Sequence, residues 1–157
     1  MEAVIDASSL ISFARAGLLD LLRRVPFDLV LLAEVRAEAV TSGLVSGHAD
    51  AAAIEAATRP LSVRASKAGS RRPVDAVVVE AATAAGLLIA NDLALGRRAR
   101  NLGAQWLRSA DVVVLLADLG RIDRLLARAA VVALRDASRI TPELAAAYLD
   151  RLGGEHE

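Results

Sequence analysis

Four carboxylates stand at the ends of predicted strands or on predicted helices. Asp6 follows a short β-branched run, and Asp92 follows a longer apolar one. Asp75 opens a helical stretch, and Glu38 lies within another. Hard divalent cations such as Mg²⁺ and Mn²⁺ take oxygen ligands, usually carboxylates together with water and substrate phosphate. The four acids therefore predict a site for Mg²⁺ or Mn²⁺.

A metal ion held by carboxylates suits phosphodiester hydrolysis, because it lowers the pKa of a bound water and neutralises charge on the phosphate oxygens. The sequence holds two histidines and no cysteine. Zinc sites built from Cys or several His are therefore excluded. A general base other than a carboxylate is not expected near these acids. The number of ions, one or two, stays open.

Each acid also has an ordinary structural explanation. Asp6 suits a helix N-cap, with Ser8 sharing the role, and Asp92 suits a turn and cap after a strand. Taken alone, Asp75 is better explained as a cap and Glu38 as an exposed helix residue. The placement of all four favours a shared site, and none of them does so singly.

Short apolar runs alternate with helical patterns along the chain, which favours a mainly parallel sheet with right-handed crossovers and helices on both faces. We therefore expect an α/β fold with three layers, α/β/α. In such sheets, sites form beyond the carboxyl ends of the strands, where Asp6 and Asp92 fall. The expected strands are 3–6, 29–32, 61–64 and 87–90, and the expected helices are 10–22, 35–42, 47–58, 75–85, 93–102, 111–119, 122–134 and a last one from 141.

The length of 157 residues fits one domain, 1–157, with 111–150 as a helical C-terminal extension of it. The formal net charge of zero argues against a protein that coats nucleic acid by bulk electrostatics. No apolar run approaches the length of a membrane span, and the first residues lack the basic region of a signal peptide. We expect a cytoplasmic protein with no membrane partner.

Two clusters of arginine flank the predicted site. Arg71 and Arg72 precede Asp75 in a basic loop, and Arg97 and Arg98 follow Asp92. These cations could hold phosphates, whereas Arg100 is better explained by a solvated helix face. Phe, Trp and Tyr make up 3% of the chain, so a stacking platform for bases is not expected. Trp106 is expected to pack in the core or at an interface.

The segment Val4-Ile5-Asp6-Ala7-Ser8-Ser9-Leu10-Ile11 resembles the opening of PIN domains, in which a strand delivers an Asp and a Ser or Thr two residues later supports it. The resemblance is to the prokaryotic PIN branch related to the nuclease toxins of type II toxin-antitoxin pairs. It extends over nearly the whole chain. It continues through Gly17 to Leu22, Val30 to Leu32, Val35 to Glu38, Asp75 to Ala82, Gly86 to Asp92, Leu115 to Gly120 and Ile140 to Leu149.

This resemblance implies a metal-dependent endoribonuclease whose catalytic and metal-binding acids are Asp6, Glu38, Asp75 and Asp92. It implies RNA as substrate and a cognate antitoxin as partner. Ser8 supports the first acid. Asn91 stands where a Thr or Asp is frequent, and its amide would support a metal-bound water.

Two further positions depart from the branch. Leu32 replaces a frequent proline, and Arg72-Pro73 replaces a frequent Gly-Glu pair, which would remove one acid from the site. Glu34 is the alternative to Glu38 as second acid.

A homodimer is expected from apolar surface beyond the needs of one small domain. The residues that suggest it are Leu18, Leu19, Leu21, Leu22 and the segment 112–116.

Two other functions compete with the nuclease. The first is a catalytically inactive PIN-like module that binds protein or RNA. The second is a metal-dependent phosphatase or receiver-like domain, which is disfavoured because no Asp-x-Asp pair follows the first strand and Lys67 is the only lysine.

Overall fold

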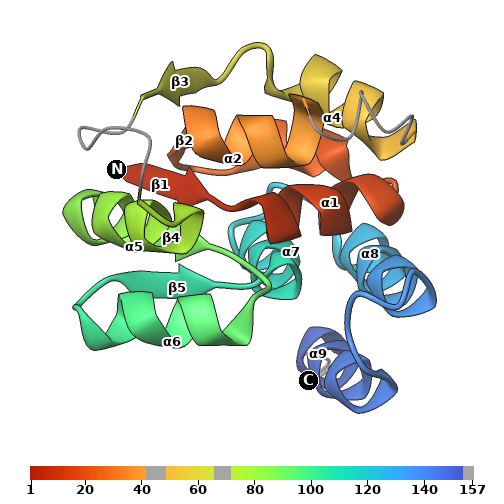
Figure 1. Ribbon diagram of the computed structural model, residues 1–157. Helices are drawn as coiled ribbons and strands as arrows, with labels where there is room; N and C mark the ends of the chain where they lie inside the picture. Colours follow the sequence, from red (N-terminus) through yellow and green to blue (C-terminus); the bar gives the residue numbers. More distant parts are fainter. Residues whose placement is uncertain (42–48, 66–71, 154–157) are drawn as a thin grey trace.

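The computed structural model describes residues 1–41, 49–65 and 72–153. A parallel sheet lies at its centre, with the strand order β3-β2-β1-β4-β5 (Figure 1). Apart from the half-buried Glu2 at the start of β1, the strands β1 and β4 are apolar and buried, as expected for a sheet covered on both faces. The strands are β1 Glu2–Ile5, β2 Asp28–Leu32, β3 Ser62–Arg64, β4 Leu87–Ile89 and β5 Gln105–Leu107.

Helices cover both faces of this sheet. α5 and α6 lie in front of it in Figure 1 and pack on β1, β4 and β5. On the other face, α1 packs against α4 and α7. The predicted three-layer α/β/α architecture is therefore confirmed. The helices of these layers are α1 Ala7–Arg15, α2 Ala33–Arg36, α4 Ala49–Thr58, α5 Val74–Ala85, α6 Leu93–Asn101 and α7 Ser109–Asp118.

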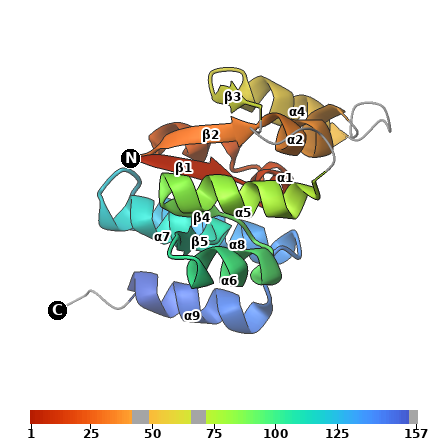
Figure 2. The same cartoon turned by 60° about the vertical axis from the view of Figure 1, so that its left-hand side comes forward.

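Two more helices, α8 Arg124–Asp136 and α9 Pro142–Gly153, form an outer layer. α8 packs on α1 and α7, and α9 packs on α7 and α8. Figure 2 shows α9 along the bottom of the molecule, away from β1 and β2. The one-domain prediction for 1–157 and the status of 111–150 as an extension stay predictions.

The order of the strands fixes where a ligand can enter. From β1 the chain adds β2 and β3 on one side, then crosses back and adds β4 and β5 on the other. The direction therefore reverses between β1 and β4, which pair directly through Val4 with Leu88 and Ile5 with Ile89. In doubly wound sheets the ligand crevice opens at this reversal, beyond the carboxyl ends of the two strands. Asp6 follows one of these ends, and Asn91 and Asp92 follow the other.

The prediction for the first helix was wrong at both ends. The helix begins at Ala7 because Asp6, and not a serine, is its N-cap, accepting from the Ser8 N–H. It stops at Arg15, close to Gly17, whose φ of 71° is left-handed. A separate 3₁₀ turn, η1 Leu19–Arg24, carries the leucines that were assigned to the same helix.

The second helix also differs, because α2 continues into a π-helical turn, η2 Ala37–Thr41, which carries Glu38. π turns inside helices are frequent at functional sites. The predicted end of this helix near 42 and the start of the next at 47 lie outside the described residues.

β5 was missed entirely, because Gln105-Trp106-Leu107 is short and begins with an exposed polar residue. It extends the sheet beyond β4 by pairing Leu88 with Trp106. The elements predicted for β2, α5, α6, α7 and α8 agree with the structure to within two or three residues at each end.

The apolar residues behind the homodimer prediction serve the core. Leu21, Leu22, Val112 to Val114 and Leu116 are buried, and Leu18 and Leu19 pack against them. The argument from excess surface is therefore wrong, and a dimer has no support from these residues. Within the described ranges, the helices are all too short or too polar to cross a membrane.

Candidate active site

Asp6 lies at the carboxyl end of β1, next to β4. Its backbone N–H donates to the Ile89 carbonyl at 2.9 Å, which fixes the residue at the reversal point of the sheet. The side chain is buried, with 6% of its surface exposed. Ser8 donates to Asp6 Oδ2 from its hydroxyl at 2.8 Å and from its backbone N–H at 3.4 Å. The predicted support of Asp6 by Ser8 is therefore present, and the cap and the candidate ligand are the same residue.

Glu38 and Asp75 approach Asp6 from two other elements. Glu38 comes from the π turn after α2, and Asp75 comes from the first turn of α5. Asp75 makes no cap, because the N-cap position of α5 is Pro73 and carries no side-chain hydrogen bond. The capping explanation for Asp75 is therefore wrong. Glu34, the alternative second acid, is half-buried one turn before Glu38.

The charges of Asp6 and Asp75 act on neighbouring carboxyl groups. Burial raises the pKa of Asp6, against hydrogen bonds from Ser8 and Ala7, and the negative charge of Asp75 raises it further. Burial also raises the pKa of Glu38, and both Asp6 and Asp75 add to this rise. A like charge within a few ångströms disfavours ionisation. Asp6, Glu38 and Asp75, here called the acidic triad, therefore share one electrostatic environment that favours a cation.

Asp92 plays a different part. It is exposed and caps α6, accepting from the Leu95 N–H through Oδ1 at 3.0 Å. It is not among the groups that shift the pKa of Asp6 or Glu38. The structure thus couples three of the four predicted acids and places the fourth at the rim, beyond β4.

A chain of polar side chains behind the acidic triad was not predicted beyond Ser8 and Asn91. The Asn91 N–H donates to Ser8 Oγ at 3.1 Å, and Asn91 Nδ2 donates to Ser12 Oγ at 2.7 Å. Asn91 Oδ1 accepts from the backbone N–H and hydroxyl of Ser109 at 2.8 and 2.7 Å. Arg139 Nε donates to Ser12 Oγ at 2.9 Å. The Asn91 side chain therefore links the end of β4 to α1 and α7 through hydrogen bonds to Ser12 and Ser109. The predicted support of a water by this amide stays a prediction.

Ser12 and Ser109 left one weak signal in the sequence, since both are serines on otherwise apolar helix faces, and both are fully buried. A buried hydroxyl needs a partner. The Ser12 hydroxyl donates to the nearby Ser8 carbonyl at 2.8 Å, but the groups that donate to it, on Asn91 and Arg139, lie far along the chain. Arg139 left no signal.

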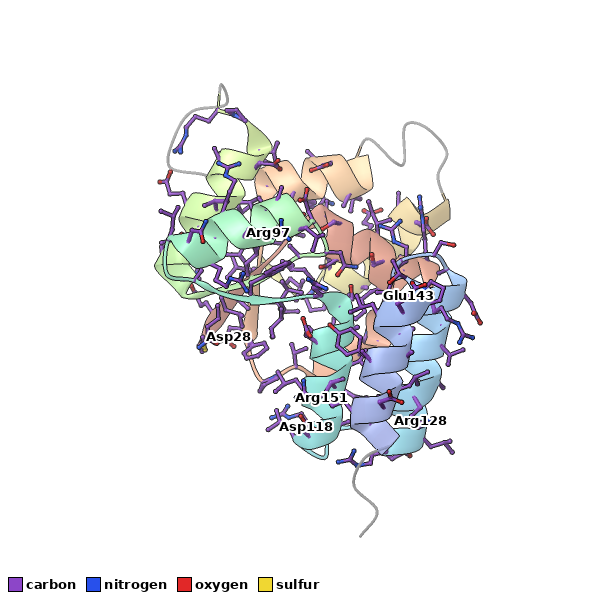
Figure 3. All side chains as sticks on the ribbon, turned by 90° about the horizontal axis from the view of Figure 1, so that it is seen from below. Asp28, Arg97, Asp118, Arg128, Glu143 and Arg151 are labelled. Atoms are coloured by element: carbon purple, nitrogen blue, oxygen red, sulfur yellow. The ribbon has the colours of Figure 1, made fainter. Side chains whose placement is uncertain are left out.

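The predicted phosphate-binding arginines fall in three different situations. Arg71 lies outside the described residues. Arg72, which precedes α5, forms an ion pair with Glu80 of that helix, and a phosphate would have to displace Glu80. Arg97 and Arg98 are exposed on α6, and in the part of the chain that the structure describes neither forms an ion pair; Figure 3 shows Arg97 on this helix.

Trp106 buttresses the end of β4. Its Nε1–H donates to the Ala90 carbonyl at 2.9 Å, and the guanidinium groups of Arg100 and Arg108 lie over its ring, 5.7 and 5.0 Å from the centroid. The expectation of a packing role for Trp106 agrees with these contacts. The Arg100 guanidinium therefore packs against Trp106, and the solvated-face explanation of Arg100 is incomplete.

The oxygen ligands of the acidic triad match the chemistry of a hard divalent ion. Over residues 1–41, 49–65 and 72–153, however, no three acidic or histidine side chains are grouped so that they could hold one ion as they stand. The triad is thus a set of coupled acids rather than a closed coordination shell.

The chain belongs to the PIN-domain family. A family model described as DUF3368, PIN domain, matches residues 2–154. PIN domains are generally nucleases, so the fold and the carboxyl-end acids belong to a nuclease class at this coarse level.

Among solved structures, the chain is similar to a PilT N-terminus domain protein from the hyperthermophilic archaeon Sulfolobus solfataricus P2. The two share 20% identity over 73% of this chain and 92% of that one, with a TM-score of 0.49. A comparison with curated proteins finds no match.

The raised pKa values predict how stability changes with pH. Between the ordinary and the raised pKa of Glu38, the folded state holds more protons than the unfolded state. The free energy of unfolding therefore falls as pH rises through this interval. In chelator, the melting temperature of Glu38→Gln minus that of wild type should increase from about pH 4 to about pH 7, as followed by circular dichroism. Asp123→Asn, an exposed cap of α8, should show no such increase. A constant difference for Glu38→Gln would contradict the coupling of the triad.

Proposed function

We propose that this PIN domain is a Mg²⁺- or Mn²⁺-dependent endoribonuclease that hydrolyses RNA phosphodiester bonds, and that it serves as the toxin of a toxin-antitoxin pair. The observation that carries the proposal is the acidic triad. In this family of nucleases, Asp6 lies at the reversal point of the sheet, and Glu38 and Asp75, from two other elements, lie near enough for their charges to interact with it. Membership of a toxin pair, with a cognate antitoxin, rests on the resemblance of the sequence alone.

Asp6 is the residue best placed to hold the ion. Its Oδ2 is fixed by Ser8, and burial makes its charge costly without a cation. Glu38 and Asp75 would complete the ligand set by turning toward Asp6, which their exposed positions allow. When bound, Mg²⁺ or Mn²⁺ lowers the pKa of water and neutralises charge on a phosphate.

The remaining residues orient and bind. Ser8 and Asn91 hold Asp6 at a fixed angle through one continuous set of hydrogen bonds. Asp92 has Oδ1 committed to its cap, and its exposed carboxylate can contact solvent or a metal-bound water at the rim. Arg97 and Arg98 present their charges to solvent and can bind phosphates of the strand.

The test is cleavage of a mixed single-stranded RNA pool with Mg²⁺, with Mn²⁺ and with chelator. We expect cutting that needs metal, and a melting temperature that rises with either ion because an ion that binds only the folded state stabilises it. Asp92→Asn should reduce cutting about tenfold or more while leaving the metal-induced rise largely in place. If folded wild type neither cuts nor gains stability from metal, the protein is instead a PIN-like binding module.

A further inference from the structure

A cleft lined by arginine lies beside the acidic triad. Its volume is about 490 Å³, which falls in the range of ligand sites. One wall comes from the end of β4 and the start of α6, and the other from the end of α8, the start of α9 and the turn between them. Its lining residues, all within the described ranges, include no acid. The polar and cationic members are Asn91, Arg108, Arg135, Ser138, Arg139 and Thr141.

Two of these arginines are held in place by side chains of the scaffold. Arg139 Nε donates to the buried Ser12 hydroxyl at 2.9 Å, and the Arg108 guanidinium lies over Trp106 at 5.0 Å. Arg135 donates from Nε to its exposed neighbour Asp136 at 3.1 Å. A bond at Nε leaves the outer edge of a guanidinium for a second acceptor, and this edge binds phosphate oxygens in pairs.

The charges around Arg139 are not balanced. Burial lowers the pKa of Arg139, and the positive charge of Arg15 lowers it further, while Asp50 acts in the opposite direction. Asp50 is itself paired with Arg15 at 3.1 Å. An anion in the cleft would relieve the remaining repulsion and replace lost hydration.

We propose that this cleft binds a phosphate of the RNA strand next to the cutting position, with Arg135 and Arg139 as positioning residues and Arg108 beside them. The inference rests on the proposed function and extends it, because it assigns part of the RNA path to the C-terminal helices. The sequence did not predict that Arg108, Arg135 or Arg139 binds RNA.

The position of Asn91 favours RNA over an acidic segment of a protein as the occupant of the cleft. Asn91 lines the cleft, its backbone N–H donates to Ser8, which supports Asp6, and Asp92 is the next residue. An RNA strand bound across the acids would therefore have its neighbouring phosphate at the cleft. The hydroxyls of Ser138 and Thr141 add neutral donors of the kind that contact phosphate and sugar. A carboxylate-rich peptide could bind the same arginines, but its negative charges would be repelled by the carboxylates of the triad.

The chain offers a matched control. Arg128 lies on α8, seven residues before Arg135, and Arg151 lies on α9. Figure 3 shows both at the far end of this helix pair, near Asp118 and opposite the end that carries Glu143. Replacing Arg128 and Arg151 removes the same number of charges from the α8–α9 pair without touching the cleft. These two substitutions also remove the Arg128 bond to the Leu149 carbonyl and the ion pair of Arg151 with Asp118.

The experiment measures binding without cutting. The full chain with Asp6→Asn is titrated in chelator against a labelled single-stranded RNA by fluorescence anisotropy over a series of salt concentrations. Adding R135Q and R139Q should weaken binding about tenfold and reduce the magnitude of the slope of log K against log salt by about 0.7, the value for one lost phosphate contact on a single strand. R128Q with R151Q should change neither quantity by a comparable amount.

Single variants protect the result against misfolding. Arg135→Gln removes an ion pair with the exposed Asp136 and should carry about half of the loss in slope. Arg139→Lys keeps the charge and loses the Ser12 bond, so it should keep the slope if the cleft acts by binding phosphate. Equal losses from the cleft pair and the control pair would overturn the inference.

The outcomes separate the two proposals. If wild type cuts RNA and the cleft variants bind as tightly as the control, the cleft inference fails and the nuclease stands. If nothing is cut but the cleft variants lose salt-dependent binding, the nuclease fails and the cleft stands. If a polyglutamate peptide binds the cleft and RNA does not, the site belongs to an acidic protein partner and the inference is overturned.

Discussion

Asp6→Asn is expected to reduce metal-dependent RNA cleavage by about a thousandfold or more, since it removes the best-fixed ligand of the triad. The same substitution should stabilise the metal-free protein by about 1 kcal/mol, or about 3 °C in melting temperature. The reason is that an amide keeps the bond from Ser8 and carries no buried charge. Cleavage assays and thermal unfolding in chelator measure the two effects.

Asp123→Asn is the matched control, because Asp123 also caps a helix, accepting from the Leu126 N–H at 2.7 Å, but lies at the exposed start of α8. It should leave cleavage within about twofold and should not raise stability. With excess Mg²⁺, the difference in melting temperature between Asp6→Asn and wild type should shrink or change sign, because the ion stabilises only the wild-type protein. If Asp6→Asn still cuts RNA at the wild-type rate, Asp6 is not part of the active site.

Gly96→Ala is expected to destabilise the protein by about 2 kcal/mol or more. In an exposed helix this change would stabilise by about 1 kcal/mol. Here, however, a Cβ at Gly96 would lie 2.0 Å from a carbon of the Trp106 ring, with two more ring carbons at 2.3 and 2.4 Å. Overpacking of this kind costs about 1–3 kcal/mol or more, and moving the ring also breaks its bond to Ala90. Chemical denaturation gives the free energy directly.

A double-mutant cycle isolates this contact. In a Trp106→Leu background the added methyl group meets a smaller side chain, so Gly96→Ala should cost at least about 1 kcal/mol less there. Gly103→Ala serves as control, because Gly103 has a φ of 96° and open space around it, and it should cost only the backbone strain of about 1–2 kcal/mol in either background. If Gly96→Ala raises the melting temperature of the wild-type chain, the close packing of α6 on Trp106 is wrong.

The sequence predicted much of the fold because its strongest signals are local. Apolar β-branched runs identified β1, β2 and β4, and periodic apolar positions identified the long helices. What failed was decided by distant contacts. β5 is a strand only because Leu88 and Ile89 offer it an edge, and the early start of α1 follows from a cap that doubles as a buried acid.

The site divides in the same way. Four acids became candidates through their order along the chain, namely Asp6, Glu38, Asp75 and Asp92. Which of their carboxyl groups interact electrostatically depends on the π turn that carries Glu38 and on the start of α5. Arg139 could not be found, because 127 residues separate it from Ser12, its hydrogen-bond partner. The cationic cleft likewise joins parts of the chain whose arginines look like ordinary surface residues in sequence.

The late position of β4 in the chain has a consequence for how the protein is made. β1 is complete at Ile5, yet its second neighbour spans Leu87–Ile89, so more than half of the chain must leave the ribosome before the central pair can form. Ser109 and Arg139 follow later still. Non-local parallel pairing is also slow. A nascent or truncated chain that stops short of these residues carries Asp6 without the hydrogen bonds that fix it, so the candidate site should be complete only near the end of synthesis.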